Sequence, residues 1–105
     1  MENDYYSSSA WALIGIHRSK PGTLTLEQGR LSFRDDEENT LFNVPTSEVS
    51  DLKFPWHYFG GGAHFTVGGE EYRISFVEPH NEWGLADGLA VAKDWKSLLT
   101  KHISS

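Results

Sequence analysis

The run GTLTLEQGRLSF, residues 22–33, constrains the fold more than any other part of the chain because it encodes a β-hairpin. Leu24 and Leu26 alternate with threonines, and after a short polar turn Leu31 and Phe33 alternate with polar residues. Alternation with a period of two is typical of strands that bury one face. The sequence therefore predicts two paired strands whose leucine and phenylalanine side chains share one core.

Further strands are predicted on both sides of this hairpin. The run AWALIGI is apolar at nearly every position, which fits a strand covered on both faces, although periodicity alone also allows a short helix. A Pro-Gly turn in HRSKPG is expected to end it. Gly68-Gly69 predicts a two-residue hairpin turn. We expect seven strands in all; besides the hairpin, they occupy approximately residues 10–16, 41–44, 49–56, 63–67 and 71–76.

The end of the chain changes its period from two to 3.6, starting at about Trp83, and Asn81 is a candidate cap. One stripe of this segment is apolar and the opposite side is charged, which predicts an amphipathic helix packed on the sheet. The predicted core combines this stripe with the inward positions of the strands: Leu24, Leu26, Leu31, Phe33, Tyr72, Ile74, Phe76, Leu89, Trp95 and Leu99.

Length and charge bound the class of protein. With 105 residues the chain is expected to form a single domain over residues 10–105, preceded by a polar, flexible tail at residues 1–9. The formal charge of −6 argues against a general nucleic-acid binder and against nonspecific adhesion to anionic membranes. No run is long and apolar enough to span a membrane, and the first residues lack the pattern of a secretory signal, so a cytoplasmic location is expected.

The order of seven short strands and one carboxy-terminal helix resembles a pleckstrin-homology-like barrel. The pattern G-x-L-x-L, a turn, R-L-x-F, an acidic loop and LF-x-V-P is similar to the GRAM branch and to small bacterial members of that superfold. The resemblance implies a mainly β fold of two crosswise antiparallel sheets capped by one helix. It also implies that a large helix residue fills the core, which is Trp95 here.

The resemblance further implies a place to look for a lipid headgroup. In phosphoinositide-binding relatives the first loop and its flanking strands carry basic residues that bind phosphates. His17, Arg18 and Lys20 match that loop, but the following strand lacks basic residues. The meander places the loop beside the carboxylates at residues 35–38, which are expected to be solvated and to repel an anion within the Debye length of about 8 Å. Weak lipid binding is therefore the alternative function, not the favoured one.

The favoured function is a non-catalytic protein-interaction module with an unknown partner or with self-association. The run WHYFGGG sets Trp56, His57, Tyr58 and Phe59 beside glycines. This fits a contact patch for a partner or for a small ligand such as a sugar or a base, or simply a strand end followed by a turn. The strand LFNVP, with its terminal proline, is a second candidate contact surface because it fits a sheet edge.

Enzyme chemistry and metal binding are not expected. The serines lie in the predicted tail, away from any histidine on a rigid turn, and the glycine run lacks the lysine and helix of a phosphate loop. The five histidines show no zinc-ligand spacing, and the acidic loop lacks the alternating pattern of a calcium loop. No cofactor is predicted.

Overall fold

Seven strands, one 3-10 helix and one α-helix make up the regular structure in the computed structural model, which describes residues 4–14, 18–54, 62–76 and 85–103. The elements are β1 (Tyr5–Ile14), β2 (Arg18–Glu27), β3 (Arg30–Asp35), β4 (Thr40–Pro45), η1 (Thr46–Glu48), β5 (Val49–Lys53), β6 (Gly62–Val67), β7 (Glu70–Ser75) and α1 (Leu85–His102).

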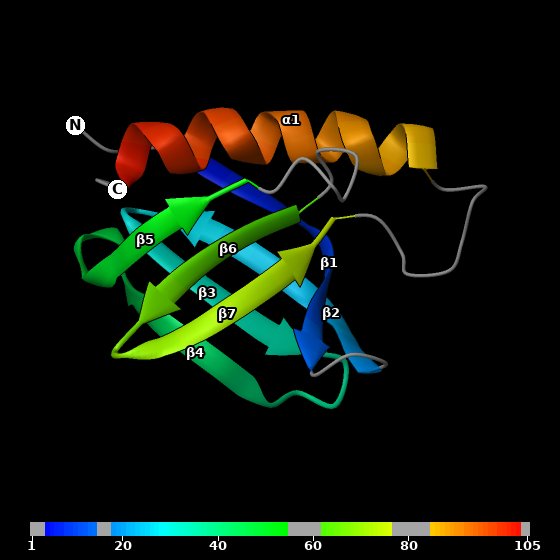
Figure 1. Cartoon of the computed structure of the whole chain (residues 1–105), viewed down its shortest axis with the longest axis horizontal. Coiled ribbons are helices and arrows are strands. Elements are labelled where there is room, and N and C mark those ends of the chain that lie inside the picture. The colour runs from blue at the N-terminus through cyan, green and yellow to red at the C-terminus, as the bar shows by residue number, and fades with distance from the viewer. Residues whose placement is uncertain (1–3, 15–17, 55–61, 77–84, 104–105) are drawn as a thin grey trace.

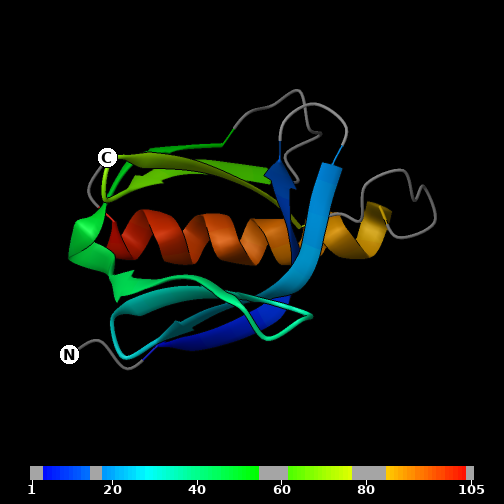
Figure 2. The same cartoon turned by 90° about the horizontal axis from the view of Figure 1, so that it is seen from below.

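The strands form one continuous antiparallel sheet in the order β4-β3-β2-β1-β7-β6-β5. The sheet folds over on itself, and α1 runs along the side between the two layers (Figures 1 and 2). Strand β1 joins the layers because it pairs with β2 along its whole length and with β7 through Trp11 and Ala12. The predicted fold class, mainly β with a carboxy-terminal helix across the barrel, is confirmed.

The opening hairpin has the register that its alternation predicts. Leu24 lies opposite Phe33, and Leu26 lies opposite Leu31, with all four side chains buried. Gln28 and Gly29 form the turn with φ angles of 51° and 75°. Positive φ at both turn residues matches the right-handed twist of the strands, which explains a glycine at the second position. Gly68 and Gly69 make the second two-residue turn, as predicted.

The core lies between the folded sheet and α1. Eight of the ten predicted core residues are buried, and Tyr72 and Leu89 are half-buried. The Tyr72 hydroxyl donates to the Leu41 carbonyl at 3.4 Å, so its tip belongs to the polar margin of the core. Leu89 lies near the amino-terminal end of α1.

The prediction of a flexible tail is wrong for Tyr5–Ser9, because these residues form the first half of β1. These residues pair with β2 from Tyr5 opposite Glu27 to Ser9 opposite Thr23. The serines are compatible with a strand here because each finds a polar neighbour or solvent; the Ser8 hydroxyl, for example, accepts a hydrogen bond from the Trp95 indole at 2.8 Å. This segment is therefore a strand despite its polar composition, and its inward side chains contact the helix.

The predicted Pro-Gly turn is also wrong, because Pro21 and Gly22 lie inside β2. Pro21 is opposite Trp11, and Gly22 is opposite both Ala10 and Asp35. A Cβ atom on Gly22 would lie 2.4 Å from the Arg34 carbonyl oxygen and 2.8 Å from the Phe33 ring. The glycine is needed because β2 and β3 approach each other closely at this position, and not because the chain turns there.

Candidate functional site

A pocket of about 200 Å³ opens where the start of β2 meets the turn between β3 and β4. We call it the acidic pocket; its lining residues are Lys20, Pro21, Asp35, Asp36 and Glu37. Strand alternation positions its central pair. Lys20 has the same parity as the buried leucines of β2, and Asp35 follows Leu31 and Phe33 on the inner face of β3. The Lys20 ammonium and the Asp35 carboxylate consequently face each other at 3.6 Å.

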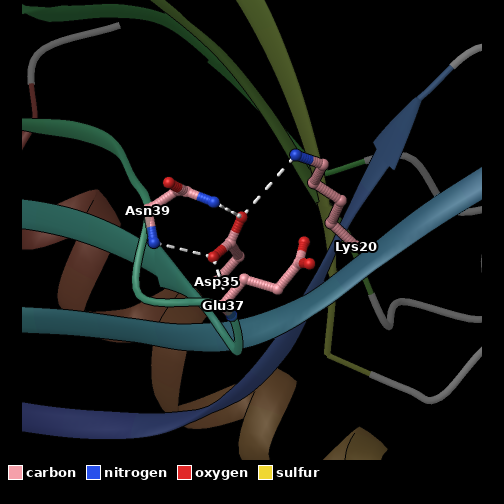
Figure 3. A network of polar contacts seen from close by, with 4 residues as sticks. All are labelled: Lys20, Asp35, Glu37 and Asn39. Carbon is pink, nitrogen blue, oxygen red and sulfur yellow. Dashed lines mark hydrogen bonds and ion pairs between the residues drawn. The ribbon is translucent and has the colours of Figure 1, made fainter.

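Asp35 organises the turn that follows β3. Its Oδ1 atom accepts backbone N–H groups from Glu37 at 3.0 Å and from Asn39 at 2.8 Å. Its Oδ2 atom faces the Asn39 amide and the Lys20 ammonium (Figure 3). Hydrogen bonding, first from the Asn39 backbone, holds the pKa of Asp35 below its ordinary value despite the opposing effect of burial. The carboxylate therefore stays ionised and keeps its hydrogen bonds to the turn and its contact with Lys20.

This arrangement corrects the expectation that residues 35–38 are simply solvated. Asp35 is 6% exposed and structural, whereas Asp36, Glu37 and Glu38 are exposed. Glu38 pairs with Arg34 at 2.8 Å. In the described part of the chain, no Lys, Arg or His forms an ion pair with the carboxylates of Asp36 or Glu37. The one signal in the sequence for a buried Asp35 was its inward parity after Phe33.

The residues matched to a lipid-binding loop are not brought together as one cationic site. Arg18 is exposed at the start of β2, and Lys20 is directed to Asp35. His17 lies outside the described residues. The expected proximity of the first loop to the acidic turn is present, since the Asp36 backbone N–H donates to the Pro21 carbonyl at 3.0 Å. A phosphate entering this pocket would meet one lysine that is already paired with Asp35, together with the carboxylates of residues 35–37.

The predicted aromatic patch lies outside the described residues, which include neither Trp56 nor the three residues that follow it. The other predicted contact surface is present: β4 is a terminal strand of the sheet, as is β5. Both edges carry features that protect against pairing with another chain. The Arg30 guanidinium donates to the Asn43 side-chain oxygen and backbone carbonyl of β4, and β5 contains a register shift and a positive φ at Asp51.

Of the histidines, the described residues include His64 in β6 and His102 at the end of α1. The His102 ring lies 2.9 Å from the Asp4 carboxylate, which also accepts a hydrogen bond from Lys101 at 2.8 Å. Among the described residues, no group of three His, Cys, Asp or Glu side chains is arranged to hold a metal ion.

Comparison with solved structures identifies the fold. A crystal structure of the pleckstrin homology domain of ArhGAP27 matches with a TM-score of 0.56, over 96% of this chain and 98% of that chain, at 13% sequence identity. This chain has a pleckstrin-homology-like fold. At that identity the likeness concerns the fold and no shared ligand, and the GRAM-like subtype stays a prediction.

Comparisons by sequence add no relative, since no family profile and no curated protein match the PH-like chain. Within its described residues, no helix combines the length and the apolar character needed to cross a bilayer. The cytoplasmic location stays a prediction.

Proposed function

We propose that this PH-like domain is a non-catalytic module that binds a protein partner rather than an anionic lipid headgroup. Domains with this fold generally act through protein or lipid interactions and not through catalysis. The observation that favours a protein partner is the contact at 3.6 Å between Lys20 and Asp35.

The charge balance of the acidic pocket supports this choice. A headgroup phosphate needs several cationic donors that are free to approach it. Here Lys20 pairs with Asp35, whose side chain is 3% exposed, and the carboxylates of Asp36 and Glu37 lie on the turn that follows. Removing Lys20 from Asp35 to serve a phosphate would leave a buried carboxylate without its cation, which is unfavourable. Arg18 would then be the remaining described cation of the matched loop.

Vesicle co-sedimentation tests the proposal against the lipid alternative. We expect the domain to stay in the supernatant with phosphatidylcholine vesicles that contain phosphatidylserine and a phosphoinositide, at physiological salt. The Arg18→Glu variant should behave in the same way. If the wild type sediments with these vesicles and the Arg18→Glu variant does not, the proposal is overturned, because this result would show a headgroup site at the first loop.

A second arm addresses the protein partner itself. Affinity capture, followed by direct binding of the purified candidate, is expected to give a defined complex whose mass is checked by light scattering. The same light-scattering measurement on the domain alone reports self-association. A domain that stays an inert monomer at all concentrations, and binds none of the captured proteins when they are purified, contradicts the proposal.

A further inference from the structure

The geometry points to a docking surface on the outside of β1 and β2 that takes an arginine- and lysine-rich segment of a partner protein. This surface, the Trp11 patch, consists of Trp11, Pro21, Asp36 and Glu37. The inference rests on the proposed protein-binding function and names the chemistry of the partner.

Trp11 faces the outside of the sheet. Its neighbours in the strand, Ala10 and Ala12, are buried in the core, whereas Trp11 is half-buried and does not belong to the core cluster. No hydrogen bond or ring contact joins Trp11 to any other residue of the described segments. Its indole is therefore partly exposed on the outer face of the sheet and lies outside the core cluster.

Pro21 connects this ring to the acidic turn. It is the cross-strand partner of Trp11, and side chains so paired lie about 5 Å apart. On its other side the Pro21 carbonyl accepts the Asp36 backbone N–H at 3.0 Å. Trp11, Pro21 and Asp36 thus form a row across neighbouring segments, and Glu37 adds a second carboxylate at the acidic pocket.

The charges of this row favour a cationic occupant. A guanidinium or ammonium group is attracted to the face of an indole and to carboxylates, and arginine does both well because its planar group stacks while it donates. Asp36 and Glu37 have no ion-pair partner among the described residues. The chain charge of −6 also steers a basic segment toward the domain and opposes a second copy of it.

The chain provides a matched control at the other end of the same two strands. Tyr5 is 64% exposed and lies opposite Glu27, which is also exposed. This pair combines an aromatic ring and a carboxylate, as the Trp11 patch does, but it lies about 20 Å along the strands. Glu27→Lys and Glu37→Lys change the net charge equally, so a difference between them reports the place of binding and not the overall charge.

The experiment measures the anisotropy of a fluorescein-labelled oligoarginine peptide titrated with the domain, and an oligoglutamate peptide serves as the ligand control. We expect the wild type to bind oligoarginine and not oligoglutamate. Trp11→Ala should weaken binding about tenfold, and Glu37→Lys about three- to tenfold. Tyr5→Ala should leave the affinity unchanged, and Glu27→Lys should change it less than Glu37→Lys.

Three results would overturn the Trp11 patch. The first is that the wild type does not bind oligoarginine. The others are an unchanged affinity in Trp11→Ala and equal losses of affinity in Glu27→Lys and Glu37→Lys. A protein partner captured and verified separately would leave the proposed function standing in each of these cases. Conversely, lipid binding through Arg18 in the vesicle assay would count against the proposed function, whereas the peptide titration would still report separately whether the Trp11 patch binds a basic segment.

Discussion

The two faces of β1 show how one strand serves stability on one side and leaves groups for recognition on the other. On the inner face, Ser8 accepts the indole N–H of Trp95, which is fully buried in α1. On the outer face, Trp11 is half-buried and contacts no other ring of the described residues. The contrast shows that the surroundings of a tryptophan, and not its residue type, decide whether it stabilises the fold.

The inner face of β1 and the residue just before the strand, Asp4, are tied to α1 at three alternate positions. Asp4 accepts hydrogen bonds from Lys101 and His102, and the Tyr6 hydroxyl donates to Asp94 at 3.0 Å. Burial and the nearby Asp94 carboxylate raise the pKa of the Tyr6 hydroxyl, which keeps it a donor. Together with Ser8, these contacts fix the first half of β1 beneath the helix. The outer face has no comparable series in the described residues, apart from Ser7 with Thr25.

The largest expected effect is that of Trp95→Ala on the free energy of unfolding. Trp95 stacks on Phe76 with ring centroids 5.9 Å apart and makes a T-shaped contact with Tyr6, whose ring centroid is 5.0 Å away. Truncating a buried aromatic residue costs about 3–5 kcal/mol, which is a large part of the stability of a small domain. Urea denaturation followed by circular dichroism measures the loss.

Trp11→Ala is the control for this comparison, with an expected loss of about 1 kcal/mol or less, because the half-buried ring has cross-strand neighbours but no place in the core. If Trp95→Ala does not fold, Trp95→Phe keeps a ring and should give a measurable, smaller loss. Similar losses for Trp11→Ala and Trp95→Phe would contradict the assigned difference between the two faces.

The inner face was predictable from sequence where periodicity is strong. Alternation gave the inward leucines of the opening hairpin, and the 3.6 period gave Trp95 on the buried stripe of α1. The first half of β1 was missed because serine-rich composition carries no hydrophobic alternation, although its inward positions bond to the helix. For Asp35 the sequence predicts a solvated loop, because this residue begins an acidic run. Its role depends on N–H groups of the following turn and on Lys20 from another strand, which short-range patterns do not reveal.

A second prediction concerns the close approach beside the acidic pocket. Gly22→Ala should destabilise the domain by about 1–3 kcal/mol, the usual cost of inserting a group into a closely packed site. The added Cβ would meet the backbone carbonyl of Arg34, which cannot move without disturbing the pairing of β2 and β3. Gly29→Asn is the control, since its site is open and Asn tolerates positive φ. A smaller loss for Gly22→Ala than for Gly29→Asn would refute this account of β2.

The smallest expected effect is on the pH and salt dependence of stability, and it compares two carboxylates, Asp4 beside α1 and Asp35 at the acidic pocket. The pKa of Asp4 is lowered chiefly by its hydrogen bond with Lys101, and that of Asp35 chiefly by the Asn39 backbone N–H. A lowered pKa in the folded state means that each carboxylate stabilises the fold above its unfolded pKa of about 4 and loses that contribution as the pH falls further.

Thermal unfolding midpoints of the wild type, Asp4→Asn and Asp35→Asn should therefore differ at neutral pH and converge in acid. Salt distinguishes the two sites. The contribution of Asp4 depends on the cationic Lys101, which is 60% exposed, so high salt should reduce the Asp4→Asn difference more than the Asp35→Asn difference. Differences that persist in acid, or that respond equally to salt, would contradict the distinction between a carboxylate held by an exposed cation and one held by backbone N–H groups.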